Sequence, residues 1–398
     1  MKMIHNLYPE IISKKNLYRS AHLAAQGRRY RDSVADFNFF LEREMETLHR
    51  ELAEKTYRHG KYRMFTIYDP KERNIAAAPF RDRVVHHAVH DVIEPFLDKT
   101  FIHDSYACRK DKGTHKAVDR AQSFLRANRF CLHGDIKKYF PSMDHGILKK
   151  MLVKRTTDKD LLWLVNGIID SAVAVNGLTG ARVSEFSSER VNGFNPQTGV
   201  PANQPRGLPI GNLTSQFFAN LYLNELDYFV KFELRCRYYL RYMDDFLVFA
   251  NDKAELNEIK IKIRDFLKTR LALDLHEGKS QVYKTSGGVK FLGFRIYKDH
   301  RRLASDNVRR FRKRLKKFDF NLENGTVSAE KISDSVRCWT AHSRYADTKG
   351  LRLRLFKGFE AKDKRFAGLL QKVLLQGSVR PGSADSPINR CCRIDGRS

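Results

Sequence analysis

Three aspartates occupy positions from which they could hold metal ions. Asp244 and Asp245 are adjacent in the tetrapeptide Tyr-Met-Asp-Asp, between two short apolar runs that predict strands. An Asp-Asp turn by itself is usually structural, but neighbouring carboxylates at a hairpin tip repel each other, and a bound cation relieves that repulsion. Asp135 ends a third predicted strand. Together Asp135 and Asp244 can hold two divalent cations about 4 Å apart, an arrangement suited to phosphoryl transfer.

The chain carries a large excess of positive charge. Its 398 residues include 74 Lys and Arg against 46 Asp and Glu, a formal net charge of +28. Such an excess is typical of proteins that bind a polyanion, because each neutralised phosphate releases counterions. The length and the 42% apolar content favour two or three domains. With no apolar run near the roughly 18 residues of a membrane span and no signal-peptide core, we expect a cytoplasmic protein without membrane contact.

Apolar periodicity predicts an α+β chain. Helices are predicted over 36–53, 81–97, 214–234 and 253–271, and from about 145. Strands are predicted over 62–75 and 130–135, on both sides of Asp244, around 273–275 and within 289–296. Residues 176–206 are rich in Gly, Ser, Asn and Pro, which predicts a long loop or hairpin insertion. Beyond 300 a basic segment predicts a separate helical module with an apolar stripe of Val308, Phe311, Leu315 and Phe318.

The three aspartates belong to an ordered series of motifs. These are Asp135 followed by Phe140, GLPIGNLTSQ (207–216), YMDD (242–245), HEGKSQV (276–282) and VKFLGFRI (289–296). Over about residues 60–300 the series resembles the fingers and palm of reverse transcriptases, and the basic helical module resembles their thumb. The resemblance implies an α+β right-hand polymerase with an antiparallel palm sheet and a small helical thumb.

The same resemblance implies a division of the chain into five parts. We expect an N-terminal helical extension (1–60), fingers with part of the palm (61–134), the palm (135–299, with the insertion at about 176–206), the helical thumb (300–376) and a flexible tail (377–398). Two Mg²⁺ ions, which Mn²⁺ can replace, are the implied cofactors.

Three segments resemble one subgroup more narrowly, the reverse transcriptases of diversity-generating retroelements. They are residues 102–120, GLPIGNLTSQFFANLYLNELD (207–227) and CWTAHSRYADT (338–348). Those enzymes copy a template repeat RNA into cDNA with errors concentrated at template adenines. The resemblance implies template RNA, a cDNA primer strand, deoxynucleotides and a small, basic, oligomeric accessory protein as partners, and a bacterial, archaeal or phage origin.

The resemblance also assigns roles to individual residues. The metal ligands are expected to be Asp135, Asp244, Asp245 and the backbone carbonyl of Ile136. The incoming nucleotide is expected to meet Lys71, Arg73, Phe140, Ile210, Gly211, Gln216 and Lys279. In that set, Phe140 excludes a 2′-hydroxyl and Lys279 protonates the leaving pyrophosphate. Primer and template are expected to meet Arg109, Lys110, Gly113, Tyr242, Met243, Phe291, Leu292 and Gly293.

Ile210 and Gln216 depart from the pattern of most related enzymes, which have Gln-Gly at the start of the 207–216 loop and Ser-Pro at its end. The usual Gln donates hydrogen bonds beside the incoming nucleotide, whereas the side chain of Ile210 can donate none. Each such contact is worth roughly 1 kcal/mol, so its loss narrows the free-energy gap between right and wrong bases. We hypothesise that these two residues make the enzyme a low-fidelity polymerase.

Several alternatives remain open. A defence-associated or orphan prokaryotic reverse transcriptase shares the palm motifs. A non-catalytic RNA-binding scaffold is disfavoured by the intact aspartates, and a two-metal nuclease would not explain the 207–216 loop. At individual positions, Lys71 and Arg73 are equally compatible with a solvated charged turn, and core packing is the rival interpretation of Phe140.

Overall fold

The computed structural model describes residues 5–68, 72–172, 194–195, 200–201, 205–357 and 368. The chain forms two compact units. Unit 1 comprises residues 1–113, 132–248 and 254–281, and unit 2 comprises 114–131, 249–253 and 282–398. The three aspartates therefore all belong to unit 1.

Unit 1 begins with four short helices: α1 (Tyr8–Ile12), α2 (Lys14–Ala25), α3 (Asp32–Phe39) and α4 (Leu41–Ala53). The prediction of a single helix over 36–53 is wrong, because the helix is interrupted at Phe40. The break lets Phe37 pack edge-on against Phe80, while Phe40 stays 45% exposed beneath the guanidinium of Arg43. The apolar residues of 36–53 belong to two helices, α3 and α4, and their spacing in the sequence does not show that the two helix axes differ in direction.

A β-hairpin follows these helices, as predicted for residues 62–75. Strands β1 (Arg63–Ile67) and β2 (Arg73–Ala77) pair antiparallel, with Arg63 opposite Ala77. Residues 69–71 at its tip, including Lys71, lie outside the described residues. Helix α5 (Phe80–Asp98) comes next and confirms the helix predicted over 81–97.

The central sheet contains four strands in the order β6-β7-β3-β8. These are β3 (Phe130–Asp135), β6 (Tyr238–Tyr242), β7 (Asp245–Ala250) and β8 (Gln281–Lys284). Because β3 lies beside β7, Asp135 is brought to the hairpin that carries Asp244. The strand expected around 273–275 is instead a single antiparallel bridge between Ile136 and Leu275.

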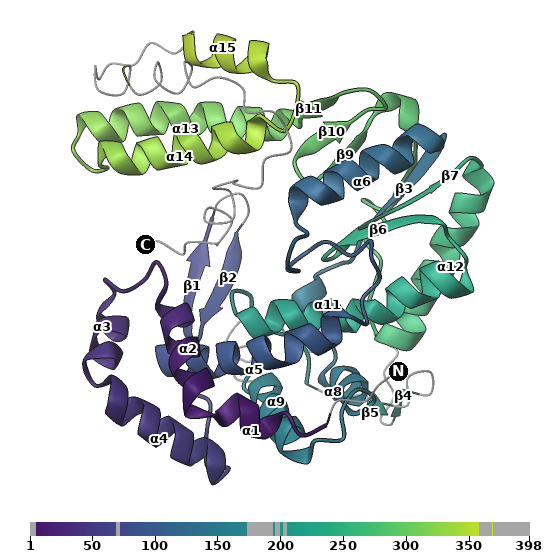
Figure 1. The fold of residues 1–398 in the computed structure, drawn as a ribbon. Helices are drawn as coiled ribbons and strands as arrows, with labels where there is room; N and C mark the ends of the chain where they lie inside the picture. Colours follow the sequence, from purple (N-terminus) through teal and green to yellow (C-terminus); the bar gives the residue numbers. More distant parts are fainter. Residues whose placement is uncertain are drawn as a thin grey trace. The chain divides into compact units, whose positions relative to one another are not determined.

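Helix α11 (Leu213–Tyr228) is almost wholly buried and lies beside α5 (Figure 1). It continues as a π-helical turn, Phe229–Glu233, so the helix predicted over 214–234 is present. Among its described residues, unit 1 also contains α7 (Tyr139–Ser142), α8 (His145–Val153), α9 (Lys159–Asp170) and α12, whose bounds Lys253–Leu271 match the prediction. Within the 176–206 insertion, β4 (Phe194–Asn195) and β5 (Val200–Pro201) pair antiparallel.

Unit 2 combines a small sheet with a helical module. Helix α6 (Thr114–Ala127) accompanies a sheet of order β11-β10-β9, formed by β9 (Val289–Phe291), β10 (Phe294–Ile296) and β11 (Arg301–Leu303). Helices α13 (Ser305–Glu323), α14 (Ala329–Ser343) and α15 (Lys349–Lys357) follow, and α13 and α14 lie side by side (Figure 1). In the helical core, Phe311 stacks on Trp339 at 3.8 Å between ring centroids, and Phe356 meets both rings edge-on.

Parts of the expected division cannot be compared with the structure. The tail predicted over 377–398 and most of 358–376 lie outside the described residues. Within the part of the chain that is described, no helix is both long and apolar enough to cross a membrane.

Gly134 makes the tightest backbone approach beside the aspartates. A Cβ atom at Gly134 would lie 2.0 Å from Cζ of Phe246 on the neighbouring strand. We therefore expect Gly134→Ala to lower the free energy of unfolding by about 1–3 kcal/mol, because Phe246 must shift. Gly167 on α9 has open space around it, so Gly167→Ala should instead raise that free energy by up to about 1 kcal/mol. Urea unfolding of both variants checks this, and a stable Gly134→Ala variant would contradict it.

Candidate active site

A tight hairpin presents two of the three aspartates. Strand β6 ends at Tyr242 and β7 begins at Asp245, which leaves only Met243 and Asp244 in the turn. Met243 has φ +56°, in the left-handed region. That conformation suits the twist of a two-residue hairpin, but it costs a residue other than glycine roughly 1–2 kcal/mol. Contacts outside the turn must therefore hold it in place.

The three carboxylates influence one another electrostatically. Burial raises the pKa of the Asp244 carboxyl to about 6, and the charges of Asp245 and Asp135 add to the increase. Lys279 donates a hydrogen bond to Asp135, with 2.7 Å between Nζ and Oδ1. His133 Nε2 lies 3.5 Å from Asp245 Oδ1. Each outer carboxylate is thus turned toward a different basic neighbour.

The residues present fit a divalent cation in their chemistry. Carboxylate oxygens are the ligands that Mg²⁺ prefers, and a cation would favour the charged form of Asp244 that burial disfavours. In the described part of the chain, no three His, Cys, Asp or Glu side chains converge into a ready-made metal cluster. Asp135 is instead paired with Lys279. Ile136 is buried and bridges to Leu275, and its carbonyl stays a predicted ligand.

The 207–216 loop is fastened to two other elements by its backbone. Leu208 donates its N–H to the Phe140 carbonyl at 2.9 Å, and the Ile210 carbonyl accepts from the N–H of Ala76 on β2 at 3.2 Å. Gly211 has φ +113°, and a Cβ there would lie 3.0 Å from Ile75. The structure therefore brings Ile210 and Gly211 to β2, and Phe140 to the start of the same loop. Arg73 begins β2 and is exposed, and Lys71 lies outside the described residues.

Gln216 lies in the first turn of α11 and contacts a neighbouring loop. Its Oε1 accepts a hydrogen bond from the Cys108 thiol at 3.3 Å. One turn further along, the amide of Asn220 donates to the Ala107 carbonyl at 2.7 Å. The loop beyond exposes Lys110 and turns at Gly113, where φ is +101°.

Arg109 differs from the prediction for this loop. Its guanidinium donates to both carboxylate oxygens and the carbonyl of Asp98, and to the carbonyls of Ile102 and Ser105. These bonds use all five N–H donors, and the side chain is only 7% exposed. No donor is left for a phosphate, so Arg109 stabilises the turn. The sequence signal was a basic run, which does not show which cation has an internal partner.

The predicted contact Phe291-Leu292-Gly293 is a turn in unit 2. Phe291 is only 1% exposed and packs in the core, so its ring is not available to a ligand. Leu292 and Gly293 have φ of +49° and +86° and join β9 to β10. A Cβ at Gly293 would lie 3.4 Å from His342 Nε2. The exposed part of this motif is therefore the backbone of its turn.

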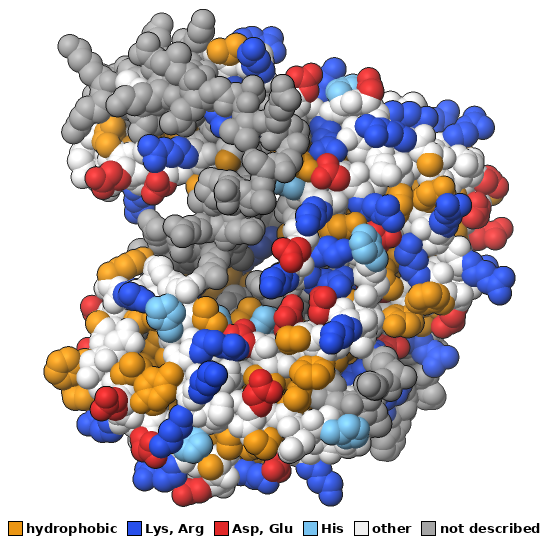
Figure 2. All heavy atoms as spheres, in the orientation of Figure 1, with side chains coloured by type: hydrophobic (Ala, Val, Ile, Leu, Met, Phe, Trp, Pro, Cys, Tyr) orange, Lys and Arg blue, Asp and Glu red, His pale blue; other side chains and the backbone are white. Residues whose placement is uncertain are grey.

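Basic side chains also gather around a cleft in unit 2. Lys and Arg side chains are scattered over the face shown in Figure 2. A cleft of about 1010 Å³ opens between β11, α13 and α15, and one acidic residue, Asp347, contributes to its lining. The basic residues that line it are Arg302, Arg309, Arg312, Lys313, Lys316 and Arg354. Such a lining suits a phosphate backbone.

Sequence reasoning missed the buried pair Arg241–Asp227 and the position of His133. Arg241 directly precedes the YMDD tetrapeptide and has no exposed side-chain surface. An arginine inside an apolar strand was the available signal, because such a residue is almost never buried without a partner. Its partner lies on a different element and could not be inferred from spacing.

The raised pKa of Asp244 predicts a cost in stability. Between the ordinary value of 3.8 and about 6, the folded protein binds more protons than the unfolded chain, so the free energy of unfolding falls as the pH rises. Without divalent metal, we expect Asp244→Asn to be the more stable protein at about pH 7.5, by on the order of 2 kcal/mol. The difference should vanish at about pH 4. Thermal unfolding with a chelator measures it, and equal stability of the two proteins at both pH values would contradict it.

Comparison with known proteins shows which sequences this chain resembles. A family model described as "Reverse transcriptase (RNA-dependent DNA polymerase)" matches residues 53–296. The chain is 25% identical over 287 residues to protein YkfC of Escherichia coli (strain K12), covering 61% of this chain and 68% of that protein. It is 22% identical over 357 residues to the group II intron-encoded protein LtrA of Lactococcus lactis subsp. cremoris, covering 73% of this chain and 55% of that protein.

A similar solved structure is that of apo telomerase from Candida tropicalis, at 14% identity and a TM-score of 0.47. The similarity covers 79% of this chain and 62% of that one. The family match decides the classification. Residues 53–296 are more than half of the 398, and they include Asp135, the 207–216 loop and the YMDD hairpin. The chain therefore belongs to the reverse transcriptase (RNA-dependent DNA polymerase) family.

Proposed function

We propose that this reverse transcriptase makes error-prone cDNA, mutated at template adenines, from the template repeat RNA of a diversity-generating retroelement. The polymerase activity rests on one observation above all. The end of β3 and the tip of the β6–β7 hairpin bring three carboxylates near enough for the charges of Asp245 and Asp135 to add to burial in raising the pKa of Asp244. A family of RNA-dependent DNA polymerases matches this region.

The chain's own residues can divide the work of nucleotide transfer. Asp135, Asp244, Asp245 and the Ile136 carbonyl would hold two Mg²⁺ ions, or Mn²⁺, which supply charge neutralisation for phosphoryl transfer. Lys279, bonded to Asp135, would protonate the leaving pyrophosphate. Lys71 and Arg73 would grip the triphosphate. Phe140 would exclude a 2′-hydroxyl.

Primer and template would meet a second set of groups. Tyr242 and Met243 on the hairpin and the turn at Leu292-Gly293 would hold the primer end, while Lys110 and Gly113 would meet the template backbone. The basic cleft of unit 2, whose lining residues all lie within the proposed thumb (300–376), would bind a phosphate backbone. We assign residues 1–60, 61–134 and 135–299 to an N-terminal extension, fingers and palm. A small basic accessory protein and a structured RNA complete the proposed assembly, in the cytoplasm.

Primer extension tests the polymerase activity. We expect the wild-type protein to extend a primer on an RNA template with deoxynucleotides and Mg²⁺. Asp244→Asn should lower that rate at least about 100-fold, because the metal ions that would neutralise charge at the reacting oxygens would lose a charged ligand. Lys268→Gln, on exposed α12 surface, is the matched control and should extend normally. Extension by Asp244→Asn at the wild-type rate would exclude the assigned site.

The low-fidelity proposal rests on side chains at positions 210 and 216. The backbone of the 207–216 loop is fixed by bonds to Phe140 and Ala76, so the Ile210 side chain can change without moving the loop. Ile210 has no hydrogen-bond donor to offer a nucleotide, and the Gln216 oxygen is bonded to Cys108. Ile210 therefore offers a nucleotide no polar contact, and the side-chain oxygen of Gln216 already has a partner.

Sequencing of cDNA tests this proposal. We expect Ile210→Gln to reduce misincorporation opposite template adenines by about fivefold, the equivalent of one restored contact of about 1 kcal/mol. Ile210→Leu keeps an apolar side chain without a donor and should leave the error frequency unchanged. The measurement uses the native RNA, with and without the accessory protein. An unchanged error frequency in Ile210→Gln would refute the role of Ile210.

A further inference from the structure

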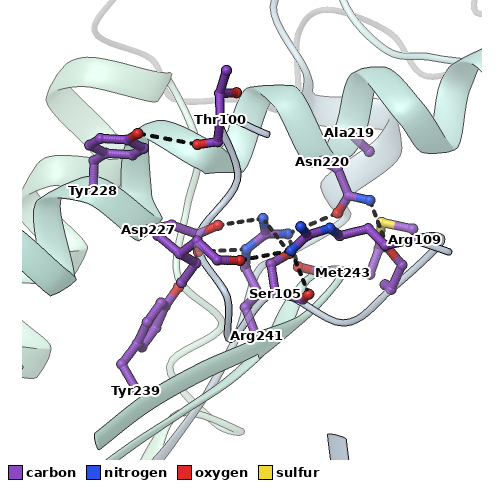
Figure 3. Close-up of polar contacts among 12 residues, drawn as sticks. Thr100, Ser105, Arg109, Ala219, Asn220, Asp227, Tyr228, Tyr239, Arg241 and Met243 are labelled. Carbon is purple, nitrogen blue, oxygen red and sulfur yellow. Dashed lines mark hydrogen bonds and ion pairs between the residues drawn. The ribbon is translucent and has the colours of Figure 1, made fainter. Parts of the chain in front are cut away.

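A buried arginine lies directly behind the catalytic hairpin. Arg241 is the fourth residue of β6, and its side chain is completely buried, as is that of its partner Asp227 near the end of α11. Figure 3 shows Asp227, Asn220 and Ser105 directed toward its guanidinium. These groups come from α11, from β6 and from the loop before Arg109, three parts of unit 1 that are far apart in the sequence.

Every donor of the Arg241 guanidinium has an acceptor. Nε and Nη2 bind the two carboxylate oxygens of Asp227 at 2.7 and 2.6 Å. The second donor of Nη2 reaches the Ser105 hydroxyl at 3.3 Å. Nη1 binds the Asn220 side-chain oxygen at 3.2 Å and the Met243 carbonyl at 3.1 Å. Five donors and five acceptors fix the plane of the group.

One of these five bonds reaches the hairpin turn itself. The carbonyl of Met243 belongs to the peptide that leads into Asp244, and Met243 is the residue with the left-handed φ. A charged donor on that carbonyl fixes the orientation of the peptide and so the direction in which Asp244 leaves the turn. The strained turn thereby gains the outside contact that it needs.

The acceptors of Arg241 are themselves held. The Tyr239 hydroxyl donates to Asp227 Oδ1 at 2.7 Å, and the Asn220 amide donates to the Ala107 carbonyl. Backbone bonds add to this, because the Arg241 carbonyl accepts from Tyr106 and its N–H donates to the Asp104 carbonyl. The guanidinium therefore has a single orientation, set by α11 and the 104–107 segment.

We propose that Arg241, oriented by Asp227, is a positioning residue that sets the geometry of Asp244 through the Met243 carbonyl. The inference rests on the proposed role of Asp244 in nucleotide transfer. A well-packed apolar pair is often as stable as a buried ion pair, so stability alone does not require charge at these positions. A directed, charge-assisted bond to the turn does require it, and displacement of a reacting group by about 1 Å lowers rates about 100-fold.

Steady-state primer extension on the full chain separates positioning from folding. The test variant is Arg241→Met combined with Asp227→Leu, which removes both charges together and leaves neither buried alone. We expect kcat to fall by about 30- to 100-fold, with the KM for deoxynucleotide and the Kd for template–primer within about twofold of wild type. Rates are divided by the fraction of molecules that bind template–primer, so misfolded protein does not lower kcat.

Two further variants keep the test decisive. Arg241→Lys retains the positive charge beside Asp227 but lacks the planar fork that reaches Met243, so it should also lose at least about tenfold in kcat at unchanged KM. Arg155→Met with Glu225→Gln removes another ion pair of α11, in which the two charged groups lie 3.5 Å apart. This control leaves the bonds of Arg241 to Asp227 and Met243 in place, and its kcat should equal that of wild type.

The outcomes distinguish the inference from the proposed function. Wild-type kcat in the double variant, or in Arg241→Lys if the double variant does not fold, overturns the inference. An equal fall in kcat for the Arg155 control also overturns it, because the effect would then be one of general stability. If the wild-type protein extends no primer, the proposed function fails. The inference is then tested by comparing the rise in Tm on adding MnCl2 between the wild type and the test variants. A smaller rise in the test variants supports positioning, and an equal rise refutes it.

Discussion

A fully buried positive charge organises the centre of this protein. Once Arg241 lies inside unit 1, its five donors require five acceptors, and these come from α11, the β6–β7 hairpin and the loop before Arg109. Breaking such a pair by removing one partner costs about 3–5 kcal/mol, so the three parts are bound to one arrangement. The helix that supplies Asp227 also begins with the 207–216 loop. The 207–216 loop and the hairpin that carries Asp244 are therefore anchored to the same helix.

The carboxylates of Asp135, Asp244 and Asp245 have the opposite effect on the folded state. Burial, with the neighbouring charges adding to it, raises the pKa of Asp244, and the turn that carries Asp244 includes a left-handed Met243. Both features weaken the folded state and would be removed by selection for stability alone. They persist because the surrounding sheet is rigid: β3 is paired beside β7, and Phe246 fills the space over Gly134. The site thus combines locally destabilising features with surroundings that offset them, as is common at functional sites.

Main-chain atoms, and not the side chains of Ile210 and Gln216, make the hydrogen bonds to Phe140 and Ala76 that position the 207–216 loop. Hydrogen bonds from main-chain atoms to Phe140 and Ala76 set the position of the loop, and Gly211 allows its close approach to Ile75. The side chains at 210 and 216 carry no part of that fastening. A polymerase can therefore change its discrimination at these positions without rebuilding its fold. The proposal of low fidelity depends on this separation.

Local patterns in the sequence determined most elements, because helical and strand periodicities are properties of neighbouring residues. They located α12, the strand that ends at Asp135 and the hairpin strands around Asp244, and the order of motifs indicated the family. Tertiary structure decided what depends on distant residues. The strand order that places β3 beside β7, the partner of Arg241, the internal bonds of Arg109 and the turn at Phe40 were not predictable from spacing. Each arises from contacts between segments whose separation in the sequence carries no information about their pairing in space.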